Sequence, residues 1–137
     1  MRAFIICVLF AGMLISTRCR KNLGLNAPFS VAWHHCSQGK FGSQHVQICF
    51  DSLLQDSRCP IGAMCVWQGT AVVRFGFTVN DSRANITLST LNLPGSYHSD
   101  TTLMGYKIEF LNLQPFPQIN VPRNVSDYKA DLKITKS

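Results

Sequence analysis

Apolar and polar side chains alternate along much of this chain with a period of two residues. Successive side chains of a β-strand point to opposite faces of a sheet, so this period indicates strands that are buried on one face. The alternating segments are 29–36, 44–51, 70–79, 85–91, 106–110 and 128–134. Turn-forming residues separate them, and no segment has a persuasive helical period. The pattern predicts an all-β fold, a small antiparallel β-sandwich or partly open barrel of about six to seven strands stapled by disulfides.

The clearest strand covers residues 70–79. Its apolar face consists of Ala71, Val73, Phe75, Phe77 and Val79. A turn at 80–83 and the alternating segment 85–91 follow it, which predicts a hairpin. This hairpin is expected to form the centre of the domain.

Three stretches between the predicted strands are expected to be loops. Residues 37–43 contain two glycines, and 92–104 is rich in Gly, Ser, Thr, Asp and Pro. The segment 115–122 contains three prolines and cannot be a ladder strand. The two longer loops are the expected binding surface, because loops on a rigid sandwich carry recognition.

The N-terminal residues have the pattern of an export signal. A basic start, Met1-Arg2, precedes an uncharged apolar run at 3–15, which is too short to span a membrane. Cys19 follows this run and resembles the acylated cysteine of Gram-negative lipoprotein signals, although Arg18 replaces the usual small residue. We therefore expect Cys19 to be acylated. In the alternative, ordinary cleavage near Ser16 leaves Cys19 as a free thiol.

These features divide the chain into three parts. Residues 1–18 are predicted to be a lipoprotein-type signal peptide, 19–28 a tether, and 29–137 a single β-sandwich domain. The predicted location is the outer membrane or periplasm of a Gram-negative bacterium. The expected membrane contact is the N-terminal lipid anchor, and simple secretion is the alternative.

The number of cysteines supports export with acylation. Of the six cysteines, Cys7 leaves with the signal peptide, so acylation of Cys19 leaves four. Four cysteines allow two bridges in an oxidising compartment. The predicted disulfides are Cys59–Cys65 and Cys36–Cys49.

The second of these disulfides has an alternative. Strand alternation places His34, Cys36, His45 and Cys49 on the outward side of two neighbouring predicted strands. Two His and two Cys are a ligand set for tetrahedral zinc or for copper. A hairpin with a loop at 37–43 places Cys36 away from Cys49, which counts against both the disulfide and the metal site. We favour the disulfide because the predicted compartment is oxidising.

The stretch around the Cys59–Cys65 ring contains other conspicuous residues. The spacing is not C-x-x-C, which favours a structural bridge over a redox centre. Asp56 and Arg58 are interpreted as a turn-closing acceptor and a cation that pairs with a nearby carboxylate or carbonyl. The alternative is a recognition loop that displays both charges. Trp67 is predicted to pack in the core or against the corner.

Four segments together resemble a known pattern. They are Asp56-Ser57-Arg58-Cys59-Pro60, Cys65-Val66-Trp67 with Gly69, Gly105-Tyr106-Lys107-Ile108 running to Leu113 and Pro115-Phe116-Pro117, and Tyr128-Lys129-Ala130-Asp131-Leu132. In these segments the chain resembles a family of small exported bacterial proteins, many of them lipoproteins, whose function is uncharacterised. The resemblance implies an exported β-domain and a signature loop of Asp56, Arg58, Trp67 and Gly69. It implies no catalytic residue.

Charge and motifs narrow the function further. Without the signal peptide, eleven Lys and Arg stand against seven Asp and Glu, a net charge of +4, and they are scattered rather than arranged in a nucleic-acid-binding stripe. No hydrolase or P-loop motif is present, so we predict no catalytic residue and no cofactor. A small hydrolase would need Asp51, Asp56 and His45 to meet in one cleft.

These observations predict a non-catalytic, lipid-anchored β-sandwich domain with a binding or structural role in the cell envelope. The expected partner is an envelope protein or a glycan. The alternative is a periplasmic metal-binding protein that uses the His/Cys face.

Overall fold

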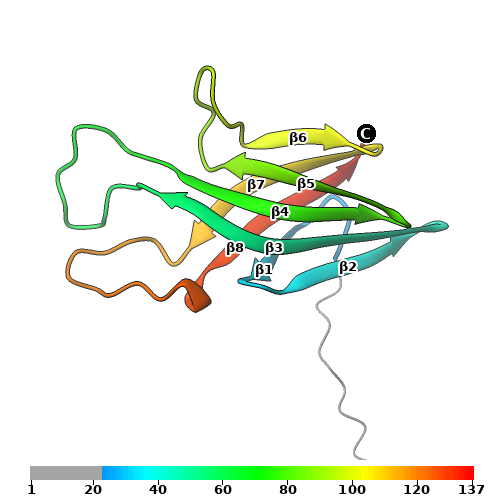
Figure 1. Cartoon of the computed structure of the whole chain (residues 1–137), viewed down its shortest axis with the longest axis horizontal. Coiled ribbons are helices and arrows are strands. Elements are labelled where there is room, and N and C mark those ends of the chain that lie inside the picture. The colour runs from blue at the N-terminus through cyan, green and yellow to red at the C-terminus, as the bar shows by residue number, and fades with distance from the viewer. Residues whose placement is uncertain (1–22) are drawn as a thin grey trace, which may run out of the picture.

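The computed structural model describes residues 23–137 and shows two antiparallel sheets of four strands packed face to face (Figure 1). The first sheet contains β2 (Cys36–Phe41), β3 (Gln44–Asp56), β4 (Ala71–Val79) and β5 (Ser82–Ser89), in that spatial order. The second contains β1 (Pro28–Ala32), β8 (Lys129–Lys136), β7 (Tyr106–Gln114) and β6 (Asp100–Leu103). The loop predicted at 92–104 therefore ends at Ser99, because 100–103 pairs with β7 as an edge strand. A 3-10 turn, η1 (Val125–Asp127), precedes β8. The predicted antiparallel β-sandwich is confirmed, and the sheets do not close into a barrel.

Aromatic side chains form the centre of the core. The ring centroids of Phe50 and Phe75, on neighbouring strands, are 5.7 Å apart, and those of Phe75 and Phe110 are 5.5 Å apart. Phe110 belongs to β7 in the second sheet, so this edge-to-face contact joins the two layers. The apolar face predicted for 71–79 is buried along its whole length. Period-two alternation therefore identified the inner face of the central strand correctly.

The strand β2 replaces the loop that the sequence predicted at 37–43. Glycine in the interior of a strand weakens it, and Gly39 was for this reason predicted to lie in a loop. Glycine also occurs in strands at places where another backbone approaches closely. Such an approach occurs here, because a Cβ on Gly39 would lie 2.6 Å from the carbonyl oxygen of Leu23. The strand predicted at 29–36 is correspondingly shorter and ends at Ala32.

These strand bounds bring Cys36 directly opposite Cys49. A two-residue turn, Gly42-Ser43, joins β2 to β3, and the two cysteines are partners in the ladder. Their sulfur atoms are 2.02 Å apart, and Cys59 and Cys65 form a second bond. Both predicted disulfides are confirmed, and the objection from hairpin geometry was wrong because it assumed a longer loop. Two structural disulfides indicate a protein that folds in an oxidising, extracellular-type environment.

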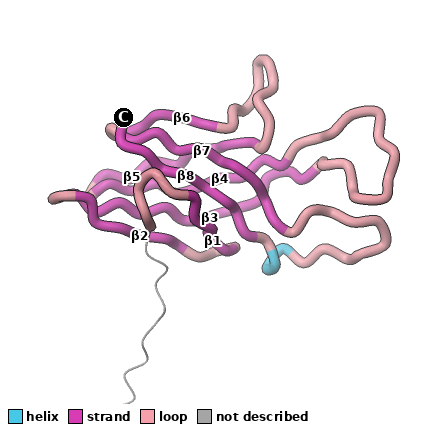
Figure 2. Tube along the Cα trace, turned by 180° about the vertical axis from the view of Figure 1, so that it is seen from behind, coloured by secondary structure: helices cyan, strands magenta, loops and turns pink. Residues whose placement is uncertain are grey.

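The two ends of the sandwich differ. Two-residue turns at Gly42-Ser43, Asn80-Asp81 and Met104-Gly105 connect strands at one end. The long connections 57–70, 90–99 and 115–128 lie at the other, which is on the left of Figure 1 and on the right of Figure 2. The molecule therefore has a turn end and a loop end.

The described chain begins inside the folded body. Leu23 is buried, and its backbone N–H donates to the carbonyl of Gln38 in β2 at 3.0 Å. The N–H of Asn26 donates to the carbonyl of Ile134 in β8 at 2.9 Å. Leu23 and Leu25, which belong to the predicted tether, thus pack on the sandwich and add to its core.

The predicted signal peptide 1–18 and Cys19 lie outside the described residues. Within residues 23–137, none of the helical structure is long and apolar enough to cross a membrane.

Removing the Cys36–Cys49 disulfide should lower the free energy of unfolding. The bond closes a sequence separation of 13, for which the loop-closure model gives about 3 kcal/mol. A Cys36→Ala/Cys49→Ala double variant, compared with the wild type by urea denaturation, measures this loss. The Cys59→Ala/Cys65→Ala variant is the matched comparison, with about 2 kcal/mol expected for its shorter ring. A loss below about 1 kcal/mol for the first variant would contradict the expectation.

Candidate functional site: two coupled loops at one end of the sandwich

Two long loops at the loop end contain the signature residues and the prolines. The ring loop, 57–70, joins β3 to β4, and the proline loop, 115–124, joins β7 to η1. The Cys59–Cys65 disulfide closes the ring loop. Two backbone hydrogen bonds close its base, from Ser57 N–H to the Thr70 carbonyl at 2.9 Å and from Cys59 N–H to the Gln68 carbonyl at 2.8 Å. The ring loop is therefore held by covalent and backbone bonds of its own.

Backbone hydrogen bonds also join the two loops to each other. The N–H of Ile61 donates to the carbonyl of Pro117 at 2.8 Å, and the N–H of Ile119 donates to the carbonyl of Ile61 at 3.2 Å. Ile61 and Gln118 form an isolated parallel bridge. The loops consequently behave as one surface rather than as two separate projections.

A buried ion pair lies beneath this surface. Nε of Arg58 is 2.8 Å from Oδ1 of Asp56, and its Nη2 donates to Oδ2 at 2.9 Å. The two side chains are only 3% and 5% exposed. A guanidinium matches a carboxylate in this two-point geometry, which gives directional as well as electrostatic stabilisation. Of the two interpretations made from the sequence, the structure supports the internal pair and not a displayed one.

Arg58 extends this pair to the proline loop. Its guanidinium donates to the carbonyl of Leu113 and, at 3.3 Å, to that of Pro115. Its Cζ also lies 4.8 Å from the centre of the Phe116 ring, a cation–π distance. One side chain of the ring loop thus satisfies backbone carbonyls at the end of β7 and the start of the proline loop.

Asp56 has two further hydrogen-bond partners, one in the proline loop and one directly before β8. Tyr128 Oη donates to Oδ2 of Asp56 at 2.8 Å, and Nη1 of Arg123 is 3.1 Å from the same oxygen. We call Asp56, Arg58, Arg123 and Tyr128 the Asp56 cluster. From the sequence, Tyr128 was predicted to begin the strand at 128–134, and Arg123 was not singled out. A lone arginine in a proline-rich loop was the available signal, but its acceptor lies 67 residues away in the chain.

The cluster controls the ionisation of Asp56. Burial by itself raises the pKa of the Asp56 carboxyl, but the hydrogen bonds from Arg58 and Tyr128 and the charge of Arg58 outweigh it. The resulting pKa lies below its ordinary value. Burial and the same carboxylate raise the pKa of the Tyr128 hydroxyl. Both shifts favour a charged Asp56 and a protonated Tyr128 in the folded protein.

Gly69 allows the two sides of the base of the ring loop to approach each other closely. Its φ is +68°, and a Cβ at this position would lie 1.8 Å from the carbonyl oxygen of Ser57. Any side chain at this position would therefore overlap with the opposite side of the loop base. This accounts in physical terms for one residue of the signature loop.

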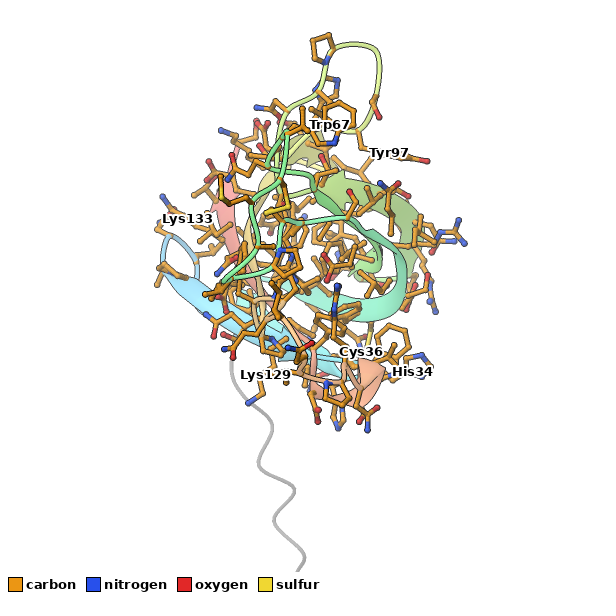
Figure 3. All side chains as sticks on the ribbon, turned by 90° about the vertical axis from the view of Figure 1, so that its left-hand side faces the viewer. His34, Cys36, Trp67, Tyr97, Lys129 and Lys133 are labelled. Atoms are coloured by element: carbon orange, nitrogen blue, oxygen red, sulfur yellow. A yellow bond between two sulfur atoms is a disulfide. The ribbon has the colours of Figure 1, made fainter. Side chains whose placement is uncertain are left out.

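The tip of the ring loop is apolar and exposed. Met64 and Val66 are fully exposed, and Trp67 is 84% exposed. Figure 3, which views the molecule from the loop end, shows Trp67 on the same side of this end as Tyr97 of the 90–99 loop. The prediction that Trp67 packs in the core or against the corner is wrong. Strand pairing stops before Trp67, so no sheet face is available to cover its ring.

The alternative sites predicted from the sequence are not assembled. The sulfur atoms of Cys36 and Cys49 are bonded to each other, and His45 lies at the turn end, where its N–H donates to Asn80 Oδ1. His34 lines a shallow hollow with the disulfide, but no group of three His, Cys, Asp or Glu within 23–137 is arranged to hold a metal ion.

The hypothetical acid–base set is not assembled either. Asp51 lies 3.8 Å from Arg83, whereas Asp56 is buried with Arg58. His45 and Asp56 lie near opposite ends of β3. The three side chains thus have different surroundings and do not share a cleft.

No protein-family model, curated protein or solved structure matches this chain. The function of the coupled loops is therefore inferred from their own contacts and exposure.

Gly69→Ala should destabilise the protein far more than Gly95→Ala. Both glycines have a positive φ near +68°, but a Cβ on Gly95 would meet no atom within 4 Å. The left-handed conformation costs about 1–2 kcal/mol in each variant, and the overlap at Gly69 adds roughly 1–3 kcal/mol more. Thermal and urea unfolding of both variants measure the difference. Equal losses would show that the close approach to Ser57 is relieved at no cost.

Acid should remove the stabilisation that Asp56 provides. Its pKa is lower in the folded protein than in the unfolded chain, so this stabilisation is fully present above about pH 4–5 and is lost as the pH falls through the folded pKa. Asp56→Asn leaves Arg58 buried without its partner and should cost about 3–5 kcal/mol near neutral pH. The gap between the wild type and this variant should narrow in acid when unfolding is measured from pH 7 to pH 2.

Asp81→Asn is the matched control for this experiment. Asp81 lies exposed in the β4–β5 turn, so its variant should follow the wild-type pH profile. A gap between the wild type and Asp56→Asn that does not change with pH would contradict the role assigned to the Asp56 carboxylate.

Proposed function

We propose that this chain is an exported, membrane-tethered, non-catalytic binding domain that recognises a protein partner through its loop end. The single observation that supports this most strongly is the exposed tip of Met64, Val66 and Trp67, which lies on a loop closed by the Cys59–Cys65 disulfide. Large apolar side chains held in solvent on a rigid support are typical of recognition surfaces.

The physical advantage of this arrangement lies in how little must change on binding. Burying apolar surface contributes about 25 cal/mol per Å², and tryptophan is enriched among the side chains that dominate binding energy. The disulfide and the Asp56 cluster already hold the loops in position. Ordering a flexible loop would otherwise cost part of the binding energy.

The chemistry of the tip favours a protein over the interior of a lipid bilayer. Residues 64–68 are exposed and belong to neither a strand nor a helix. Irregular backbone needs hydrogen-bonding partners, which lipid chains do not provide and a protein surface does. A protein partner can cover the apolar side chains and also bond the peptide groups between them.

The position of the first described residue is compatible with a tether. The backbone N–H of Leu23 is hydrogen-bonded to the carbonyl of Gln38. Gln38 lies in β2, four residues before Gly42 of the β2–β3 turn. A chain attached through its N-terminus would therefore be held nearer the turn end, and the loop end would be free to meet a partner. The lipoprotein-like signal with Cys19, together with the resemblance of the signature segments, supports the tether.

The charged groups of the site support a binding role rather than a catalytic one. Asp56 and Arg58 are buried and bonded to each other, so neither is available to a substrate. The exposed apolar side chains of the tip, Met64, Val66 and Trp67, carry no acid, base or nucleophile. We therefore expect the loop end to bind a partner and not to catalyse a reaction.

Capture of partners from the envelope of the producing cell tests the proposal. The disulfide-bonded wild type, a Met64→Ser/Trp67→Ser variant and a Leu111→Ser control are immobilised in parallel. Leu111 is an exposed apolar residue on β7, outside the two loops. Losing a tryptophan hot spot of about 2 kcal/mol should weaken partner binding roughly 30-fold, with no loss for Leu111→Ser.

The outcome can also contradict the proposal. If the double variant and the wild type bind the same proteins with equal affinity, the tip is not the recognition surface. Urea unfolding of each variant verifies that the substitutions leave the fold intact, as their exposed positions predict.

A further inference from the structure

The loop end contains a hollow as well as a projecting tip. The hollow has a volume of about 160 Å³ and lies within the proline loop, where Phe116, Val121, Pro122 and Tyr128 line it. A cavity of about 150 Å³ in a protein binds a benzene ring, so this space accommodates one large apolar side chain. The tip of the ring loop presents such side chains, Met64 and Trp67, fully or largely exposed.

Tip and hollow are held in a constant relation within one molecule. Ile61 of the ring loop is hydrogen-bonded to Pro117 and Ile119 of the proline loop. Arg58 connects the bases of both loops. The projection and the hollow lie on two loops that are hydrogen-bonded to each other. A two-fold symmetric contact requires such a combination, because each copy must present both halves.

The charges of the loop end do not oppose such a contact. Residues 59–70 contain no charged side chain, and Arg123 is the only one in 115–124. At the hollow, Arg123 is paired with the carboxylate of Asp56 at 3.1 Å, and Asp127 also lines the space. Two copies that meet at this end therefore bring together mainly uncharged surfaces, whereas the chain as a whole carries an excess of positive charge.

We propose that the occupant of the hollow is the ring-loop tip of a second copy of this chain. The two copies form a two-fold symmetric dimer in which Trp67 and its neighbours in each copy fill the hollow of the other. This inference rests on the proposed function, since it names the partner of the same loop end. The contact is small, so we expect a reversible dimer with a Kd in the micromolar range.

Sedimentation velocity of the disulfide-bonded exported chain over a range of concentrations tests the dimer. The wild type should dimerise reversibly. Trp67→Ala removes the projection and Val121→Arg blocks the hollow, and each should raise the Kd at least 10-fold. Val121 is 54% exposed, so this variant should still fold, and urea unfolding verifies it. Leu111→Ala is the control, with an unchanged Kd.

A mixture of the two variants separates this geometry from general adhesion. Trp67→Ala retains the hollow and Val121→Arg retains the projection, so a mixed dimer keeps one of the two contacts. An equimolar mixture should therefore dimerise more strongly than either variant alone. Fluorescence of Trp67 should shift to shorter wavelength as the wild type associates.

Two results would overturn the inference. One is a wild type that stays monomeric at about 1 mM, a concentration that reveals even a millimolar Kd. The other is dimerisation that neither Trp67→Ala nor Val121→Arg weakens. If the chain is monomeric and envelope capture still depends on Trp67, the second-copy inference fails while the proposed function stands.

Discussion

The buried contact between Asp56 and Arg58 is the interaction on which the loop end depends. Asp56 is the last residue of β3, and Arg58 follows it after one residue, so the pair forms where the sheet ends. Each member then reaches further: Arg58 to the carbonyls of Leu113 and Pro115, Asp56 to Arg123 and Tyr128. A buried ion pair is weak evidence for net stability, because desolvation offsets much of its attraction. Its clearer effect here is directional, since it sets where both loops begin.

The two disulfides act at different levels of the structure. Cys36–Cys49 joins neighbouring strands within the first sheet, where the ladder already holds them in register. Cys59–Cys65 lies outside the sheets and restricts a loop that has few apolar contacts of its own. The first bond therefore strengthens the scaffold, whereas the second maintains the shape of the exposed tip. Both need the oxidising environment that the cysteine pattern indicates.

The aromatic core supports the loop that carries the exposed tip. Phe50, Phe75 and Phe110 pack the two sheets against each other. A rigid support allows the ring loop to keep Met64 and Trp67 in solvent without collapsing onto the core. The short turns at the opposite end need no such support, because two residues suffice to reverse each chain.

The sequence by itself determined the class of fold, the inner face of β4 and the cysteines that pair. These properties follow from local rules: a period of two marks a half-buried strand, and several cysteines in a small domain of an oxidising compartment form bridges. The tertiary structure decided what local rules do not contain. Whether Trp67 is buried depends on where strand pairing stops, and whether 37–43 is a loop depends on how closely Leu23 approaches Gly39. Arg123 and Tyr128 lie 67 and 72 residues after Asp56 in the chain, so only the folded arrangement of the loops brings them to its carboxylate.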